Sequence, residues 1–428
     1  MNLLGGTIFG FPALFPILFR MNIYQNSCES GINPCYQQIK HYQNAMTLGL
    51  AAFDLPAFLT GILIDRFGCR FVKLISLIFH IIGWVSLALI KPGYDWLIYI
   101  HCIFSSISGI IIVITSYTSS NYFSKSRPFI SSLLAGAGIS ATMWFAIFQT
   151  LIDKEYFELK TLSYIWLSFG LLVFFTSFLF LDWNYSFANL SYQFDIQLET
   201  NNHQNETNEM TIWKTLRNPL YILIVLFLSV LIIPTVFLSV IWEPFIRFIT
   251  KENESLSKNY TFIYNISTLS AIVICPINGY LLGFKADQSH KQKLFNISIV
   301  ETISWLLNLI LCFILMFPSS NTIIVVLILN CLCRSTIVSA CQSVISTFFP
   351  SRYIGRLSGI MWSFVGAFTF IQFLLIKLTD PINQSWKAWL IIIIMALLMT
   401  SHLGQIWWKY FKYKSLQMTN SYLTNTRF

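Results

Sequence analysis

Long apolar runs with almost no polar face constrain this chain more than any other feature. Residues 71–90, 219–241 and 323–333 contain few side chains that water could solvate. A helix of a soluble protein keeps one face polar, so helices of this composition are more stable in lipid. The whole chain agrees, because 55% of its residues are apolar and only 11% are charged, against about 25% charged in an ordinary soluble domain. The sequence predicts an integral membrane protein.

Hydropathy and turn signals divide the chain into twelve predicted transmembrane helices, so the expected fold class is all-α. A span needs about 20 mostly apolar residues, because the hydrocarbon core is about 30 Å thick and a helix rises about 1.5 Å per residue. The predicted spans are 1–20, 44–64, 72–90, 97–123, 129–151, 162–182, 218–242, 260–283, 294–317, 322–349, 357–378 and 386–409. The first begins at Met1 with no preceding tail, a pattern expected of a truncated N-terminus.

The distribution of basic residues predicts the orientation in the membrane. Alternate connections, with the C-terminal tail, carry sixteen Lys and Arg on one side and ten on the other. Because cytoplasmic loops are enriched in these residues, we place the first side and both termini in the cytosol, with the plasma membrane as the expected location. The net charge of +9 then reflects orientation and attraction to anionic lipid, and nucleic acid is not an expected partner.

A polar segment splits the chain six helices plus six. Residues 184–215 are rich in Asn, Glu and Thr and too polar to pack a core, so a disordered cytoplasmic linker is expected there. We expect an N-terminal six-helix bundle at 1–183, a C-terminal bundle at 216–411 and a cytoplasmic tail at 412–428. Two such halves around a central cavity suit a transporter with its site near the membrane midplane.

The connection between the second and third spans carries the strongest motif. It reads Gly61-Ile-Leu-Ile-Asp65-Arg66-Phe-Gly68-Cys-Arg70, which resembles the cytoplasmic signature of the major facilitator superfamily. The glycines permit a tight turn, and the Asp65 carboxylate can pair with a basic group of the other half and act as a gate. The alternative is an ordinary positive-inside loop with a chance aspartate. The second copy, after span eight, has Gly283 where the aspartate belongs, so that half lacks the carboxylate of a matching gate.

Four further segments resemble solute carrier family forty-three, whose members are facilitators for purine nucleobases or large neutral amino acids. They are Phe9-Gly10-Phe11-Pro12, Thr47-Leu48-Gly49 with the signature loop, Cys275-Pro276-Ile-Asn278-Gly279, and Phe349-Pro350-Ser351 with Gly355 and Gly359, preceded by Arg334-Ser335. This resemblance implies sodium-independent uniport by alternating access, with Gly10 and Pro12 near the cavity and a family-like loop at Pro350, Ser351 and Gly355. The first and third segments, with Ile371-Gln372-Phe373, are more similar to the nucleobase branch, and Ser339-Ala340-Cys341 to the amino-acid branch.

Three charges lie inside predicted spans, where an unpaired ion costs several kcal/mol. Arg334 lies mid-span with Gln342 on the same face, and we interpret it as a contact for substrate or for gating, or else as one partner of a structural pair. Asp54 could bind a proton, a cationic substrate group or Arg334 across the halves, and this charge departs from the family pattern. Glu301, near the expected cytosolic end of its span, is interpreted as an interfacial charge.

Aromatic and amide side chains offer weaker candidates. Trp144, Tyr264 and Asn265 are positioned in their spans to stack on a planar substrate and hydrogen-bond to it. Most other aromatic residues are expected to face lipid, and the small residues of spans four and five are expected to serve helix packing.

The remaining candidate residues concern metal binding, catalysis, a disulfide and glycosylation. The cysteines and histidines show neither metal-ligand nor catalytic spacing, and no phosphate-binding Gly-Lys-Ser/Thr loop is present, so we expect no metal, no cofactor, no ATP and no enzyme. A channel, a receptor or a membrane-embedded enzyme remains as an alternative class, and a functional monomer is expected. Cys28 and Cys35 are disulfide candidates in an outer loop, and Asn253 and Asn259 are glycan candidates.

Overall fold

Every regular element in the described part of the chain is a helix. The computed structural model describes residues 1–28, 35–123, 126–180, 212–286, 289–349 and 353–425, and these residues contain no strand. Pro350, Ser351 and most of the predicted linker lie outside them. The all-α fold class predicted from hydropathy is therefore confirmed.

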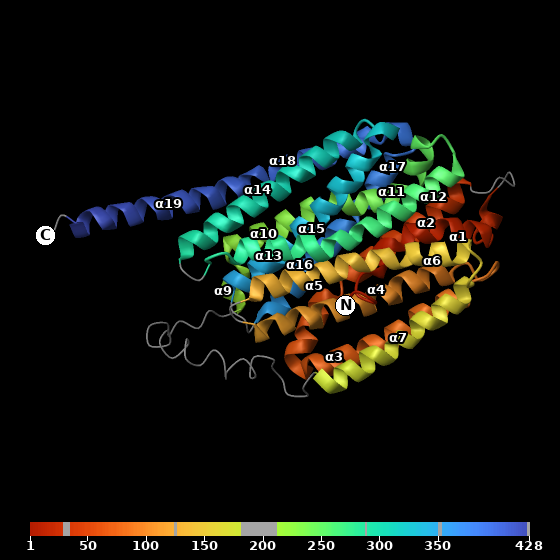
Figure 1. Ribbon diagram of the computed structural model, residues 1–428, viewed down its shortest axis with the longest axis horizontal. Coiled ribbons are helices and arrows are strands. Elements are labelled where there is room, and N and C mark those ends of the chain that lie inside the picture. The colour runs from red at the N-terminus through yellow and green to blue at the C-terminus, as the bar shows by residue number, and fades with distance from the viewer. Residues whose placement is uncertain (29–34, 124–125, 181–211, 287–288, 350–352, 426–428) are drawn as a thin grey trace.

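Two groups of helices lie side by side along the long axis of the molecule (Figure 1). The first half contains the 3₁₀ helix η1 (Thr7–Leu14), α1 (Phe15–Arg20), α2 (Tyr36–Asp54), α3 (Ala57–Ala88), α4 (Leu97–Thr118), α5 (Arg127–Ser140), α6 (Trp144–Asp153) and α7 (Leu159–Phe180). The second half contains α9 (Ile212–Leu216), α10 (Pro219–Leu231), α11 (Ile233–Ile249), α12 (Glu254–Ile266), α13 (Ala271–Gly283), α14 (His290–Leu315), α15 (Ile323–Phe348), α16 (Ile354–Thr369), α17 (Ile371–Lys377), α18 (Trp386–Leu398) and α19 (Thr400–Asn425).

The described helices are compatible with twelve crossings of a membrane. Ten helical stretches are long and apolar enough to span, and one of them, Tyr36–Ala88, has 53 residues. A straight helix of that length would extend about 80 Å, so this stretch must cross twice. The chain turns at Gly68, whose φ of 80° and ψ of 163° are readily adopted only by glycine. The apolar helix Thr7–Arg20 is shorter than these ten stretches and corresponds to the first predicted span.

Prolines explain two of the places where one helix ends and the next begins directly after it. Pro56 separates α2 from α3, and Pro234 lies at the start of α11, two residues after the break at Ile232. A proline ring has no N–H and clashes with the preceding turn, so the helix ends or bends before it. At the first of these breaks, the hydroxyl of Ser363 on α16 donates to the carbonyl of Leu55 (2.8 Å) and accepts from the amide of Phe58 (2.9 Å). A side chain of the second half thus hydrogen-bonds to backbone groups of the first half at this break.

Two expectations about element boundaries were wrong. Residues 1–20 do not form one α-helix, because a 3₁₀ segment that contains Pro12 precedes the short α1. Asn259 does not lie in a loop, because α12 begins at Glu254 and the turn before it is correspondingly short. Polar residues at the start of α12 hid the beginning of this helix from a hydropathy argument.

The halves meet along helices that approach each other at small residues. The contacts between them join α3 to α16, α5 to α13 and α15, and α6 to α12. A Cβ added at Gly136 on α5 would lie 2.5 Å from the carbonyl oxygen of Ala271, and one at Gly279 on α13 would lie 2.6 Å from the Ser132 hydroxyl. Glycine at these positions lets the backbones approach closely, as small residues do in lipid.

Candidate functional site

A small cavity lies between the two halves, around Arg334 of α15. Its volume is about 30 Å³, which leaves room for no more than a few waters. Four aromatic rings contribute to its wall, namely Phe9, Phe53, Tyr117 and Trp362. A solute larger than water can occupy this position only when the halves move apart.

The Arg334 guanidinium is buried in this cavity wall and has few protein partners. Only 5% of the residue is exposed, and its guanidinium carbon lies 3.9 Å from the centre of the Phe9 ring, which is cation–π geometry. It donates one long hydrogen bond, 3.5 Å, to the hydroxyl of Thr142 in the first half. Since a guanidinium has five N–H donors in a planar fork, this group can still donate to a planar acceptor in the cavity.

Asp54 is also buried between the halves, at the end of α2. Its charge interacts with that of Arg334 without a direct ion pair, and its Oδ1 has no hydrogen-bond partner among the described residues. A Cβ added at Gly366 of α16 would lie 2.8 Å from the Cβ of Asp54, so the carboxylate sits where the two halves touch. The structure thus places opposite charges from α2 and α15 near one central position.

Three other predicted cavity residues lie in the second half and bond within it. The Tyr264 hydroxyl bonds to that of Ser239, and its ring stacks on Trp242 with 4.2 Å between ring centres. Asn265 donates to the carbonyl of Thr261 (2.9 Å), and Gln342 donates to the hydroxyl of Ser358 (2.9 Å). None of the three contributes to the wall of the central cavity.

Trp144, Gly10 and Pro12 have packing roles within the first half. The Trp144 indole N–H donates to Asn2, and the ring packs edge-on against Trp166. A Cβ at Gly10 would collide with the carbonyl of Thr142, so glycine is required for the contact between η1 and the residues before α6. Pro12 lies inside η1, where its carbonyl accepts the amide of Phe15. None of the three lines the central cavity.

The signature residues meet the second half at the end of the molecule where α7 ends and α9 begins, hereafter the linker end. The Asp65 carboxylate forms an ion pair with the guanidinium of Arg356 on α16. A Cβ added at Gly61 would lie 2.7 Å from the carbonyl oxygen of Gly355, so α3 and α16 touch there through their backbones. Arg356 is the partner that the sequence argument did not name, although it directly follows the family-like Gly355.

The two arginines of the signature have different surroundings. Arg70 donates to the carbonyls of Ser177 and Phe178 at the end of α7 (3.1 and 2.9 Å). Arg66 lies with its guanidinium 5.3 Å from the centre of the Phe67 ring at the surface. Arg70 therefore holds helices of the same half together, while Asp65 links the halves.

The opposite end of the molecule carries the disulfide and the glycan candidates. Cys28 and Cys35 are joined as a disulfide, with their Cα atoms 5.8 Å apart. Asn253 is exposed at the start of α12, where its side chain accepts the amide of Leu256, and Asn259 is exposed on the same helix.

Glu301 is not the interfacial charge that its position suggested. It is fully buried in α14, and its Oε2 lies 2.9 Å from Nε2 of the buried His402 on α19. The two residues are 101 positions apart, so nothing in the sequence pattern connected them. The apolar residues around Glu301 in the sequence do not reveal that a side chain from another helix faces it.

These features define a class of protein: a polytopic membrane protein whose two helical halves close around a central position near Arg334. Residues 37–372 match the Major Facilitator Superfamily, and the chain belongs to this family.

Solved transporters share this fold at low sequence identity. The human organic anion transporter MFSD10 (TETRAN) superposes with a TM-score of 0.62 and 14% identity, over 94% of this chain and 97% of that one. The proton:xylose symporter XylE gives 0.63 and 13%, over 94% of each chain. The nucleoside transporter NupG gives 0.52 and 14%, over 95% and 97%. The shared architecture is that of a membrane transporter, and these neighbours differ in what they carry.

Proposed function

We propose that this protein is a facilitative, sodium-independent carrier of purine nucleobases that works by alternating access. The observation that supports this most directly is the central cavity, where aromatic rings surround the guanidinium of Arg334. Aromatic faces bind a planar base, and an arginine fork matches the carbonyl and ring-nitrogen acceptors on a purine edge. The indole N–H of Trp362, which has no partner among the described residues, supplies a further donor.

Asp65 and Arg356 are proposed to be the gate of this cycle. Their ion pair joins the halves at the linker end, so it favours the arrangement in which that end is closed. When the pair separates, α3 and α16 can move apart and open the central position to the linker side.

The alternative substrate is a large neutral amino acid. Arg334 would bind the carboxylate of the zwitterion, and Asp54, with its unpartnered Oδ1, would accept its ammonium group. The aromatic wall would then contact the apolar side chain. We place this second, because the span-one and span-eight segments resemble the nucleobase branch.

Competition uptake distinguishes the two substrates. Cells that express the protein are given radiolabelled adenine or radiolabelled leucine, each with an excess of guanine or of leucine. We expect adenine uptake that guanine blocks and leucine does not. Leucine uptake that excess guanine leaves unchanged, without adenine uptake, would instead establish the amino-acid alternative.

We also propose that the protein acts as a monomer in the plasma membrane with both termini in the cytosol. The excess of Lys and Arg at the linker end supports this orientation. An introduced cysteine at Asn205 should react with an impermeant maleimide only after permeabilisation of the cells. Reaction in intact cells would invert the orientation.

A further inference from the structure

A second cavity, of about 250 Å³, opens at the end that carries the disulfide. Pro16, Phe19 and Arg20 of α1 form one wall, and the rest comes from α11, the following turn and the start of α12. The cavity therefore lies between the two halves, as the central one does, but it is larger and its wall is much more polar.

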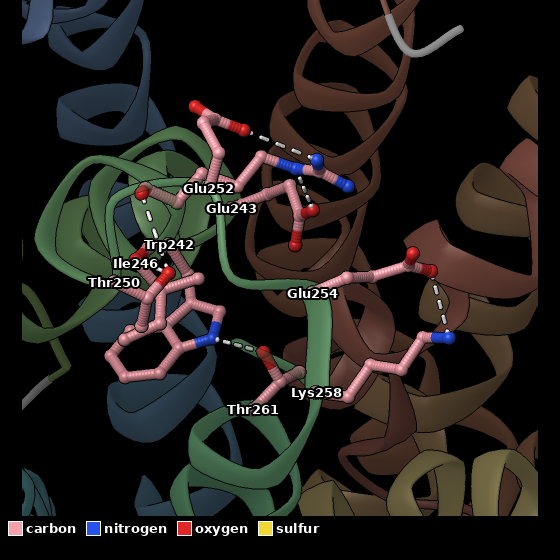
Figure 2. A network of polar contacts seen from close by, with 9 residues as sticks. Trp242, Glu243, Ile246, Thr250, Glu252, Glu254, Lys258 and Thr261 are labelled. Carbon is pink, nitrogen blue, oxygen red and sulfur yellow. Dashed lines mark hydrogen bonds and ion pairs between the residues drawn. The ribbon is translucent and has the colours of Figure 1, made fainter. Parts of the chain in front are cut away.

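Ion pairs order the charged side chains of this wall (Figure 2). The Arg247 guanidinium bonds to the Glu243 carboxylate (2.7 Å) and lies 3.5 Å from that of Glu252. Lys258 pairs with Glu254 at 2.9 Å, and Arg20 pairs with Asp153 of α6. Each basic group at the cavity thus already has a carboxylate partner.

The Glu243 side chain differs from the other acidic side chains because it is buried and only one of its carboxylate oxygens has a hydrogen-bond partner among the described residues. It is 2% exposed, and its Oε1 accepts from Arg247. Its Oε2 has no hydrogen-bond partner among the described residues, although the residue lines the cavity. A buried carboxylate oxygen without a donor is costly, so this atom favours an incoming N–H group.

The charge balance of the wall points to the same kind of ligand. Arg20 is neutralised by Asp153, which lies outside the wall. Among the remaining wall residues, Arg247 and Lys258 supply two positive charges, and Glu243, Glu252 and Glu254 supply three negative ones. The set is therefore short of one positive charge. A metal ion would need several oxygen ligands, whereas the other carboxylates here already bind Arg or Lys.

We propose that this cavity binds the ammonium group of a small organic solute, with Glu243 Oε2 as the acceptor. Pro16 and Phe19 provide an apolar wall for a short carbon chain next to that group. The ligand touches α1 of one half and α11 of the other, so the arrangement described here holds it, and separation of the halves at this end releases it. The inference does not depend on which solute the central site carries.

The neighbouring contacts hold Glu243 in place for this role. The Trp242 indole donates to the hydroxyl of Thr261 on α12 (2.9 Å), and the Thr250 hydroxyl donates to the carbonyl of Ile246 (2.8 Å), as Figure 2 shows. The Arg247 guanidinium also lies 5.5 Å from the centre of the Phe19 ring in the other half. These contacts fix the position of Glu243 between α11, α12 and α1.

Thermal unfolding of the purified full chain in detergent tests the proposal. The probe is n-propylammonium chloride, and the controls at equal concentration are tetramethylammonium chloride, which has the charge but no N–H donor, and sodium chloride. We expect only the probe to raise Tm saturably, by about 2 °C or more. No saturable rise, or an equal rise with either control, would overturn the proposal.

Two variants locate the binding. Glu243→Gln keeps the size and an acceptor for Arg247 but removes the charge, and it should raise the half-maximal probe concentration about tenfold or more. Ser257→Phe fills the cavity without changing charge and should abolish the rise. Glu158→Gln, an exposed residue that does not line the cavity, is the matched control and should bind as the unaltered protein does. Unchanged binding in Glu243→Gln would refute the assignment of the acceptor.

Discussion

Arg334 is the residue on which the proposed substrate site depends most. Arg334→Ala removes the buried guanidinium from the wall of the central cavity, so we expect uptake to be lost while the amount of protein at the cell surface is retained. Arg334→Lys keeps the charge without the planar fork and should reduce uptake about tenfold or more. Surface biotinylation and initial uptake rates measure both effects.

The matched control for Arg334 is Lys91→Ala, which removes an exposed cation from the turn between α3 and α4. It should leave uptake unchanged. Normal uptake by Arg334→Ala would remove this residue from the site and with it the main argument for the central cavity.

The Glu301–His402 pair should matter for stability and not for recognition. His402→Ala leaves a fully buried carboxylate without its donor, and breaking such a pair costs roughly 3 kcal/mol. Glu301→Gln keeps an oxygen that can accept from His402 Nε2, so this variant should lose less free energy of unfolding than His402→Ala. Thermal unfolding in detergent gives both values, and equal losses would show that the hydrogen bond contributes little.

At the level of elements, the contact between α3 and α16 should control opening at the linker end. Asp65 and Arg356 are partly exposed, so their pair contributes about 1 kcal/mol at most, and Asp65→Asn should increase the open population about fivefold. Ser343 on α15 is buried against Ser132 of α5, and a cysteine at position 343 reports that opening. We expect N-ethylmaleimide to label it about five times faster in Asp65→Asn.

Charge exchange provides the control for this gate. The double variant Asp65→Arg with Arg356→Asp restores a pair of opposite charges between the same helices. Its labelling rate should return toward that of the unaltered chain. A rate as fast as in Asp65→Asn would mean that the carboxylate acts through a contact other than Arg356.

For the molecule as a whole, passive transport predicts that no ion gradient drives uptake. We expect the initial rate of adenine uptake to be the same when sodium is replaced by choline and when a proton ionophore is present. The physical reason is that a uniporter needs only a site that opens to each side in turn, so net flux follows the gradient of the substrate alone. Accumulation above the external concentration that collapses with the ionophore would show coupling, and Asp54→Asn should then abolish it.

The sequence predicted the helical class and most spans because long apolar runs and turn residues act locally. It predicted the signature turn because Gly68 is needed for a particular backbone conformation. It did not predict which polar side chains face one another, since Tyr264 and Gln342 bond within their own half whereas Asp65 reaches Arg356. Helical spacing gives the face of one helix, but the partner of that face depends on packing between segments far apart in the chain.

The glycine contacts between the halves bear on how fast the halves can move apart. Where Gly136 meets Ala271 and Gly61 meets Gly355, the backbone of one helix lies against the backbone of the other. Helices that touch through backbone atoms at these glycines can separate there without a change of side-chain rotamer. Only dispersion contacts and a few hydrogen bonds must be broken. We therefore expect the barrier to reorientation to come from the polar contacts between the halves, such as Asp65 with Arg356 and Arg334 with Thr142, and the glycine contacts to add little to it.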